Sequence, residues 1–232
     1  MAMYWNDDKD KAPGFVIPDD VVDLAYKIGC PTIPLDHAHS LSSALLEALP
    51  WLAEEEYAGI HLIHGAASGN GWMRPEDTKN ELLHLSRRTR MRLRIPNSRL
   101  QEAQALSGET LDIEGHPLEI GKSDVFLLSS LPTLFSRYVI TREELDESEF
   151  LEEVARQLQA LDIPSRKMLG GITHTMNFSD GPVFTRSLMV ADLEPEQSVR
   201  LQKVGIGEGR TRGCGLFVPH KGIEPVNKPG GE

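Results

Sequence analysis

Residues 195–219, PEQSVRLQKVGIGEGRTRGCGLFVP, decide how the second half of the chain folds. The apolar spacing predicts a short helix over Pro195–Val204 and a strand over Gly215–Pro219, with a glycine-rich loop between them. A dinucleotide-binding fingerprint runs from strand to loop to helix. Because this loop follows a helix and enters a strand, its polarity excludes that fold.

The loop from Gly205 to Gly215 has the composition of a phosphate-binding segment. Five glycines in eleven residues allow a close backbone approach to a phosphodiester and could direct N–H groups toward it. Arg210 and Arg212 add charge and bidentate donors. The alternative is a flexible connector, but the two arginines favour contact with phosphate.

With the helix and the strand that flank this loop, the second half of the chain has the order strand, helix, strand, strand, helix, strand. The predicted elements are a strand over Thr133–Thr141, a helix from Phe150 to Leu161, a hairpin of Lys167–Phe178 and Val183–Leu193, and the helix and strand described above. Alternation places one set of side chains of the first strand on one face, namely Leu134, Ser136, Tyr138 and Ile140.

The first half has the same order. The predicted elements are strands over Val21–Ile28, Tyr57–His64, Arg88–Ile95 and the pieces of Thr110–Ile120, and helices over Leu41–Leu49 and Ser98–Ser107. This is the ferredoxin-like unit. The predicted fold class is α+β with two tandem ferredoxin-like (RRM-related) lobes. We expect an N-terminal lead at 1–19, lobes at 20–121 and 122–223, and a tail at 224–232.

Net charge first argues against a nucleic-acid partner. The chain has 24 basic and 35 acidic residues, a formal charge of −11. The acidic residues are concentrated, however, in residues 1–60 and in the run 143–153, which has seven acids and no base. Residues 87–99 and 200–221 are basic instead. The distribution therefore predicts confined cationic surfaces on an acidic protein, which is compatible with RNA binding.

The strand at 88–95 carries the strongest of these charge patterns. Alternation places four guanidinium groups on one face: Arg88, Arg90, Arg92 and Arg94. Arginines on an exposed edge strand would protect it from unwanted pairing. Four of them in a row exceed that need, so we expect a surface that binds a polyanion.

Other features limit the class of protein. No apolar run approaches the ~20 residues of a membrane span, and the N-terminus lacks a secretory pattern. Cys30 and Cys214 cannot form a disulfide framework, so we expect a cytoplasmic protein with no membrane association.

Two histidines lie at the expected start of the first helix, His37 and His39, where Asp36 or Ser40 could cap it. The positive helix end disfavours an imidazolium and favours a neutral imidazole that can accept a proton. The alternative is a histidine without chemistry. His61 and His64 point to opposite faces of a strand and make a poor metal pair, so no metal site is expected.

Several segments together resemble a known family. They are DH-x-x-x-L at 36–41, LPWL at 49–52, GIH at 59–61, SGNGWMRP at 68–75, LSRRTRMRLRIP at 85–96, RSLMVADL at 186–193 and GIGEGRTRGCGLFVPHKGI at 205–223. The pattern resembles the CRISPR-associated repeat endoribonucleases of the Cas6 family, in particular the Myxan-subtype branch, over about residues 20–223. The family's two ferredoxin-like lobes agree with the element order.

The resemblance implies binding of CRISPR repeat RNA, as stem-loop, precursor and mature guide, and cleavage of the precursor without metal or cofactor. In that reaction the 2′-hydroxyl attacks the adjacent phosphate and leaves a 2′,3′-cyclic phosphate and a 5′-hydroxyl. This activity is compatible with a protein that keeps its cleaved RNA bound and joins other subunits of an effector complex.

The resemblance also assigns site residues. His37 matches the family's acid/base histidine, His39 is its near alternate, and His61 and Tyr57 are further candidates. The first helix has no lysine, so an arginine or the glycine-rich loop would stabilise charge on the phosphorane. By the same resemblance, RNA contacts fall on a set comprising Lys203, Gly205, Gly207, Gly209, Arg210, Arg212, Gly213 and Gly215. On the basis of charge alone, we add the four strand arginines to the expected RNA contacts, and also Arg74, which lies near Trp72 in the sequence.

Two other classes of function stay open at this stage. One is a non-catalytic RNA-binding subunit of a CRISPR effector complex, which would share the fold and the loop. The other is a ferredoxin-like domain that binds an anionic metabolite. Steep salt dependence would indicate RNA contact by several arginines.

Overall fold

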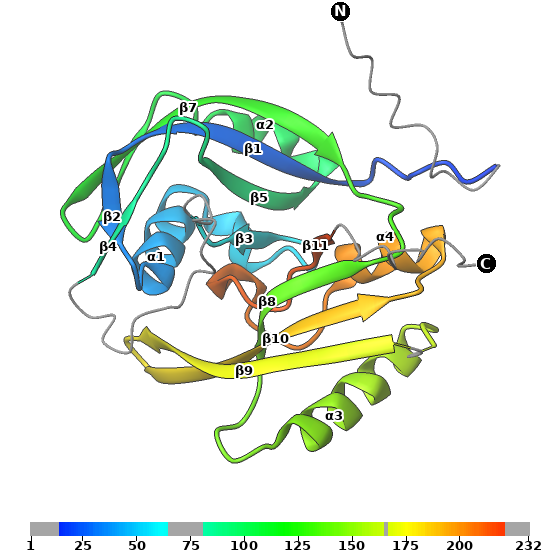
Figure 1. The fold of residues 1–232 in the computed structure, drawn as a ribbon. Helices are drawn as coiled ribbons and strands as arrows, with labels where there is room; N and C mark the ends of the chain where they lie inside the picture. Colours follow the sequence, from blue (N-terminus) through cyan, green and yellow to red (C-terminus); the bar gives the residue numbers. More distant parts are fainter. Residues whose placement is uncertain (1–13, 65–80, 165–166, 221–232) are drawn as a thin grey trace, which may run out of the picture.

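The computed structural model describes residues 14–64, 81–164 and 167–220, which form two successive lobes (Figure 1). The first lobe contains β1 (Val21–Gly29), β2 (Thr32–Pro34), α1 (Ala38–Ala48), η2 (Pro50–Ala53), β3 (Gly59–His61), β4 (Leu82–His84), β5 (Arg90–Pro96), η3 (Asn97–Arg99), α2 (Leu100–Gln104), β6 (Thr110–Ile113) and β7 (His116–Leu127). The second contains β8 (Leu134–Ile140), α3 (Glu147–Ala160), β9 (Lys167–Phe178), β10 (Gly181–Ala191), α4 (Pro195–Val204), η4 (Arg210–Arg212) and β11 (Val218–Pro219).

The first lobe is a ferredoxin-like unit with one added strand. Its antiparallel sheet has the order β3-β5-β1-β7-β6, and α1 and α2 connect the strands of the two β-α-β halves. β6 is the addition, and it forms a hairpin with β7 through Glu114 and Gly115, both at positive φ. A short hairpin turn requires this backbone conformation, which glycine adopts at little cost.

The second lobe repeats the arrangement. Its sheet has the order β11-β8-β10-β9, so the first strand again lies between the third and fourth and the second strand is at an edge. The tandem ferredoxin-like fold class predicted from the sequence is therefore confirmed. β2 and β4, which pair with each other beside α1, were not predicted.

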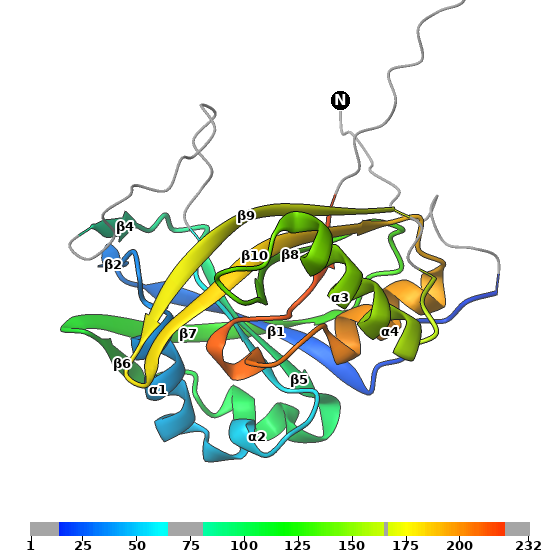
Figure 2. The same cartoon turned by 90° about the horizontal axis from the view of Figure 1, so that it is seen from below.

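Each sheet buries one apolar face under its own helices. Leu24, Leu93 and Ile60 of the first sheet belong to a cluster with Leu41 and Leu45 of α1. A second cluster packs the β8 and β10 side chains against α3 and α4. The other faces of the two sheets turn toward each other, and the glycine-rich loop with η4 lies between the lobes (Figures 1 and 2). The inter-lobe surface is therefore where polar side chains from both lobes can meet.

Two predicted boundaries need correction. β7 continues to Leu127, which pairs with Val22, so the predicted lobe boundary at 121/122 falls inside a strand. The connection between the lobes is the segment 128–133. The strand predicted to start at Arg88 starts at Arg90, because residues 87–88 form a turn in which the Thr89 amide donates to the Ser86 carbonyl.

A bulge changes the predicted faces of β8. Two of its residues, Arg137 and Tyr138, oppose the single residue Ser187 of β10. An extra residue on one strand inverts the alternation beyond it. Leu134 therefore packs in the core of the second lobe, whereas Tyr138 and Ile140, predicted to share its face, contact an inter-lobe cluster.

In the part of the chain that the structure describes, none of the helices has the length and apolar character needed to cross a membrane.

Candidate functional site

His37 is the N-terminal cap residue of α1, and the residue is buried, with 4% of its surface exposed. Nδ1 lies 3.0 Å from the carbonyl oxygen of Pro34 and 3.2 Å from that of Leu35. Since carbonyls only accept, Nδ1 carries the proton and Nε2 accepts a hydrogen bond from the Ile63 amide at 3.1 Å. Because both ring nitrogens form hydrogen bonds with backbone groups, neither is available to a substrate in this arrangement, which leaves His37 unsuited to transfer a proton.

The predicted cap is not formed. Neither Asp36 nor Ser40 caps the helix with its side chain. Asp36 instead accepts a hydrogen bond from the Asn177 amide group at 2.6 Å, and the Ser40 hydroxyl donates to the His37 carbonyl. The contact with Asn177 ties the start of α1 to the tip of the β9–β10 hairpin, which reaches α1 from the other lobe (Figure 2).

His39, the near alternate, lies two residues further along the chain and is only half-buried. Its ring packs edge-on against Phe178 of the hairpin, with 5.8 Å between the ring centroids and an interplanar angle of 74°. The Arg212 guanidinium lies over the same phenyl ring at 4.9 Å. The hairpin thus brings together a half-exposed imidazole and a guanidinium that are distant in sequence.

Asp180 completes this group, which we call the α1 site: Asp36, His39, Phe178, Asp180 and Arg212. Arg212 donates two hydrogen bonds to the Asp180 carboxylate, at 2.6 and 3.3 Å. These bonds, together with the positive charge of Arg212, hold the pKa of the Asp180 carboxyl below its usual range. Sequence analysis placed Asp180 only in the connection between the two strands of the predicted hairpin, because nothing local indicates that this connection reaches α1.

The amides of the glycine-rich loop donate hydrogen bonds to the loop itself and to the neighbouring elements α3, α4 and β8. The amides of Gly205 and Gly213 donate to carbonyls of Leu201 and Arg210, and that of Gly215 donates to Tyr138 of β8. The exposed Gly207 amide donates to the Gln157 side chain at 2.9 Å. These four amides are therefore not directed at a ligand, contrary to the prediction for them.

Close packing is what requires the glycines. Gly213 has φ 87°, and a Cβ there would lie 2.5 Å from Cγ of Leu62. Gly205 has φ 79°, and a Cβ there would lie 2.4 Å from the carbonyl oxygen of Gly215. Gly209, the residue before η4, is also left-handed at φ 78°. The loop is a rigid spacer that fixes Arg212, not a flexible connector.

Arg210 joins the lobes. Its guanidinium donates to the carbonyls of Tyr57, Ala58 and Val204 at 2.9, 3.1 and 2.7 Å. Burial lowers the pKa of Arg210 to about 10. Because its Nε, Nη1 and Nη2 each donate to a backbone carbonyl, Arg210 holds the loop against the first lobe, and the structure does not support its predicted role in RNA contact.

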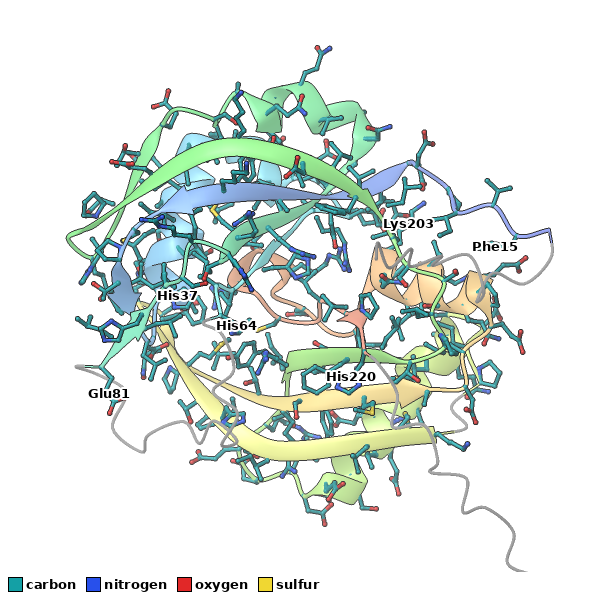
Figure 3. All side chains as sticks on the ribbon, turned by 45° about the horizontal axis from the view of Figure 1, so that its top comes forward. Phe15, His37, His64, Glu81, Lys203 and His220 are labelled. Carbon is teal, nitrogen blue, oxygen red and sulfur yellow. The ribbon has the colours of Figure 1, made fainter. Side chains whose placement is uncertain are left out.

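Lys203 lies at the other end of the molecule from His37, the residue at the start of α1 (Figure 3). The ammonium of Lys203 pairs with Asp20 and lies 4.7 Å from the centre of the Tyr57 ring. Tyr57 is therefore not part of the α1 site, and Lys203 is separated from Arg212.

Arg94 differs from the other arginines of its strand because it is fully buried. It donates to both oxygens of Asp23, at 2.8 and 3.0 Å, and to the carbonyl of Gln202 in α4 at 2.7 Å. Burial opposes ionisation of Asp23, but the nearby Arg94 outweighs it, and the pKa of Asp23 is lowered. The prediction that Arg94 contacts RNA is wrong, since it connects the two lobes in their interior.

His61 lies beside this ion pair, with Nε2 3.7 Å from the Asp23 carboxylate. Burial lowers the pKa of His61, although Asp23 opposes the shift. Its ring nitrogen Nε2 is buried without a hydrogen-bond partner. His61 is thus a neutral imidazole on β3, directly opposite Arg92 of β5.

The remaining strand arginines line a cavity of about 490 Å³ between the lobes, which we call the inter-lobe pocket. From the first lobe it is lined by His61, Leu62, His64, Arg88, Thr89, Arg90 and Arg92, and from the second by Phe135, Arg137, Tyr138, Gly213, Leu216, Val218 and Pro219. Gly213 of the pocket lining is the sequence neighbour of Arg212, which belongs to the α1 site. Sequence reasoning missed the β8 residues, since the bulge that directs them is invisible in the pattern. Arg74 and Trp72 lie outside the described residues.

Comparison with known proteins agrees with this architecture. The sequence model of the Cas6 family, described as Cas6 Crispr, matches residues 22–222. The chain is 33% identical over 198 residues to the CRISPR-associated endonuclease Cas6 of Myxococcus xanthus (strain DK1622), covering 85% of this chain and 81% of that protein.

Solved structures share the fold. A CRISPR-associated protein Cas6 superposes with a TM-score of 0.56 at 11% identity, covering 87% of this chain and all of that one. A Cas6-related protein from Pyrococcus furiosus gives 0.51 at 14% identity, over 85% and 97%. A RAMP protein described as binding different RNA substrates gives 0.56 at 14% identity, over 85% and 98%. With the family match over most of its length, the chain belongs to the Cas6 family of CRISPR-associated endonucleases.

Proposed function

We propose that this protein binds CRISPR repeat RNA and cleaves the precursor within the repeat to give guide RNAs, without a metal or cofactor. The observation that carries the proposal is the α1 site, where the half-exposed His39 and Arg212 contact the same phenyl ring next to an arginine-lined pocket. Membership in the family and the curated name of the Myxococcus relative support the nuclease activity.

His39 is the proposed proton-transfer group. As a neutral imidazole it takes the proton of the 2′-hydroxyl, whose oxygen then bonds to the adjacent phosphorus. The bond from phosphorus to the 5′-oxygen breaks, and that oxygen takes up a proton from the solvent. The products are a 2′,3′-cyclic phosphate and a 5′-hydroxyl end.

Arg212 is the proposed stabiliser of charge on the phosphorane. Asp180 and Phe178 hold its guanidinium beside His39, and a phosphate that enters the site would compete with Asp180 for its N–H groups. The first helix has no lysine that could stabilise this charge, and an arginine of the glycine-rich loop takes that role instead. We also propose that the cleaved hairpin stays bound and that other effector-complex subunits join it there.

The chemistry of the products tests this proposal. Purified protein is incubated with the repeat RNA of its own locus in EDTA, and the product ends are identified by mass and by sensitivity to phosphatase before and after acid opening of the cyclic phosphate. We expect undiminished cleavage and cyclic phosphate ends, since the proposed groups are all side chains.

An absolute requirement for a divalent cation would contradict the mechanism. Tight, salt-dependent binding without cleavage would indicate instead the non-catalytic RNA-binding subunit. Weak, salt-insensitive binding of the RNA would favour the anionic-metabolite alternative.

A further inference from the structure

The inter-lobe pocket concentrates positive charge in an acidic protein. Four arginines line it, Arg88, Arg90, Arg92 and Arg137, and its lining includes no Asp or Glu. The whole chain has a net charge of −11. Like charges held around one cavity repel each other unless an anion enters, so the pocket selects a ligand with several negative charges.

Flat rings occupy the same walls. Tyr138 and His64 lie side by side with 6.1 Å between ring centroids and a tilt of 30°. Phe135 supplies a third ring, over which the Arg137 guanidinium lies at 6.0 Å. On the first lobe, Arg92 of the pocket lining also lies over the ring of Phe126, an exposed residue outside the lining, at 5.6 Å. Rings alternating with guanidinium groups match a ligand that alternates bases with phosphates.

The bulge in β8 makes the arrangement possible. In a regular strand, consecutive residues point to opposite faces, and either Arg137 or Tyr138 would face the core. Because both oppose the single Ser187, both reach the pocket. Bulges recur next to functional sites, where they redirect a side chain.

The dimensions favour a single strand. A cavity of about 490 Å³ has the size of a small-ligand pocket, whereas a duplex keeps its bases stacked inside and presents only its backbone and grooves. We propose that the pocket binds an unpaired nucleotide of the repeat RNA, with its base against Tyr138 and His64 and its flanking phosphates on Arg90, Arg92 and Arg137. This rests on the proposed RNA function and specifies the part of the RNA that the pocket takes.

The test uses the full chain and repeat RNA with a 2′-deoxy nucleotide at the cleavage position mapped in EDTA, so that the RNA stays intact. 2-Aminopurine is placed at each unpaired position in turn. We expect its fluorescence to be quenched on binding at one position, and an abasic site there to weaken binding by about 5- to 150-fold.

Tyr138→Ala is expected to remove the quenching and to weaken binding of normal RNA by a similar factor, with no further loss from the abasic site, because both changes delete one contact. Arg137→Gln should reduce the slope of log affinity against log salt by about 0.7. Arg142→Gln is the matched control, since Arg142 is 68% exposed and pairs with Glu153 of α3.

A repeat RNA lacking the nucleotide at the quenched position that competes as well as the full repeat would overturn the inference, and so would equal quenching in wild type and Tyr138→Ala. If Tyr138→Ala does not fold, His64→Ala, at an exposed position, is read in the same assay. If the protein neither binds nor cleaves the repeat, the proposed function fails as well. Cleavage without any position-specific quenching refutes the pocket alone.

Discussion

Replacing His39 with alanine is expected to lower the single-turnover rate of repeat cleavage by about 10²–10⁴-fold, the usual contribution of one general acid or base. The affinity for the repeat should change little, because the RNA contacts that we propose lie on the arginines of the inter-lobe pocket. Rates are measured at saturating protein, and affinity is measured separately with RNA blocked at the cleavage position.

His37→Ala is the informative companion, since the two histidines are two residues apart. Its loss removes the acceptor of the buried Ile63 amide and the donor to the Pro34 carbonyl. We expect a lower melting temperature and, in the folded fraction, a cleavage rate close to wild type. A folded His37→Ala protein without activity, beside a fully active His39→Ala protein, would return the catalytic role to His37 and contradict our assignment.

Arg94→Met is expected to destabilise the protein by about 3–5 kcal/mol, because it leaves the Asp23 carboxylate buried without its partner. For a chain of this length, that corresponds to a fall in melting temperature of roughly 6–20 °C. Differential scanning calorimetry measures it directly.

Arg92→Met is the matched control, two residues away on the same strand and the same face. Arg92 is exposed and lines the inter-lobe pocket, so we expect a stability change of no more than about 0.5 kcal/mol and a clear loss of RNA affinity. The double variant Asp23→Leu/Arg94→Met should recover much of the stability, since no charge is then left unpaired. Equal stability losses in the two single variants would refute the assignment of Arg94 to the interior.

The two-lobe fold could be predicted from the sequence because the patterns that determine its helices and strands are local. Amphipathic helices such as 195–204, and strands bounded by glycine and proline, follow from the spacing of apolar residues alone. Repetition of the same element order then gave the tandem architecture, and the sheet orders of the two lobes agree with it. The short pair β2–β4 escaped prediction because each strand has three residues, too few to show a period.

The site was only half predictable. The sequence supplied the region, the start of α1, and the residue types, histidine and arginine. Whether His37 or His39 can transfer a proton depends on which imidazole accepts a hydrogen bond from the Ile63 amide. That imidazole is His37, which is 26 residues from Ile63 in the sequence. Likewise, alternation makes the four arginines of the strand look equivalent. One of them, Arg94, is instead buried and donates hydrogen bonds to Asp23 and to the Gln202 carbonyl.

The sequence alone therefore determined the element order, the repetition of the lobe and the confinement of positive charge to a few segments, since these depend on periodicity and composition. The tertiary structure alone decided which charges face solvent and which side chains meet. Arg212, Phe178 and His39 come together only through the docking of one lobe on the other. Arg137 and Tyr138 share a pocket only because a bulge shifts the register of β8, and register is set by pairing between strands.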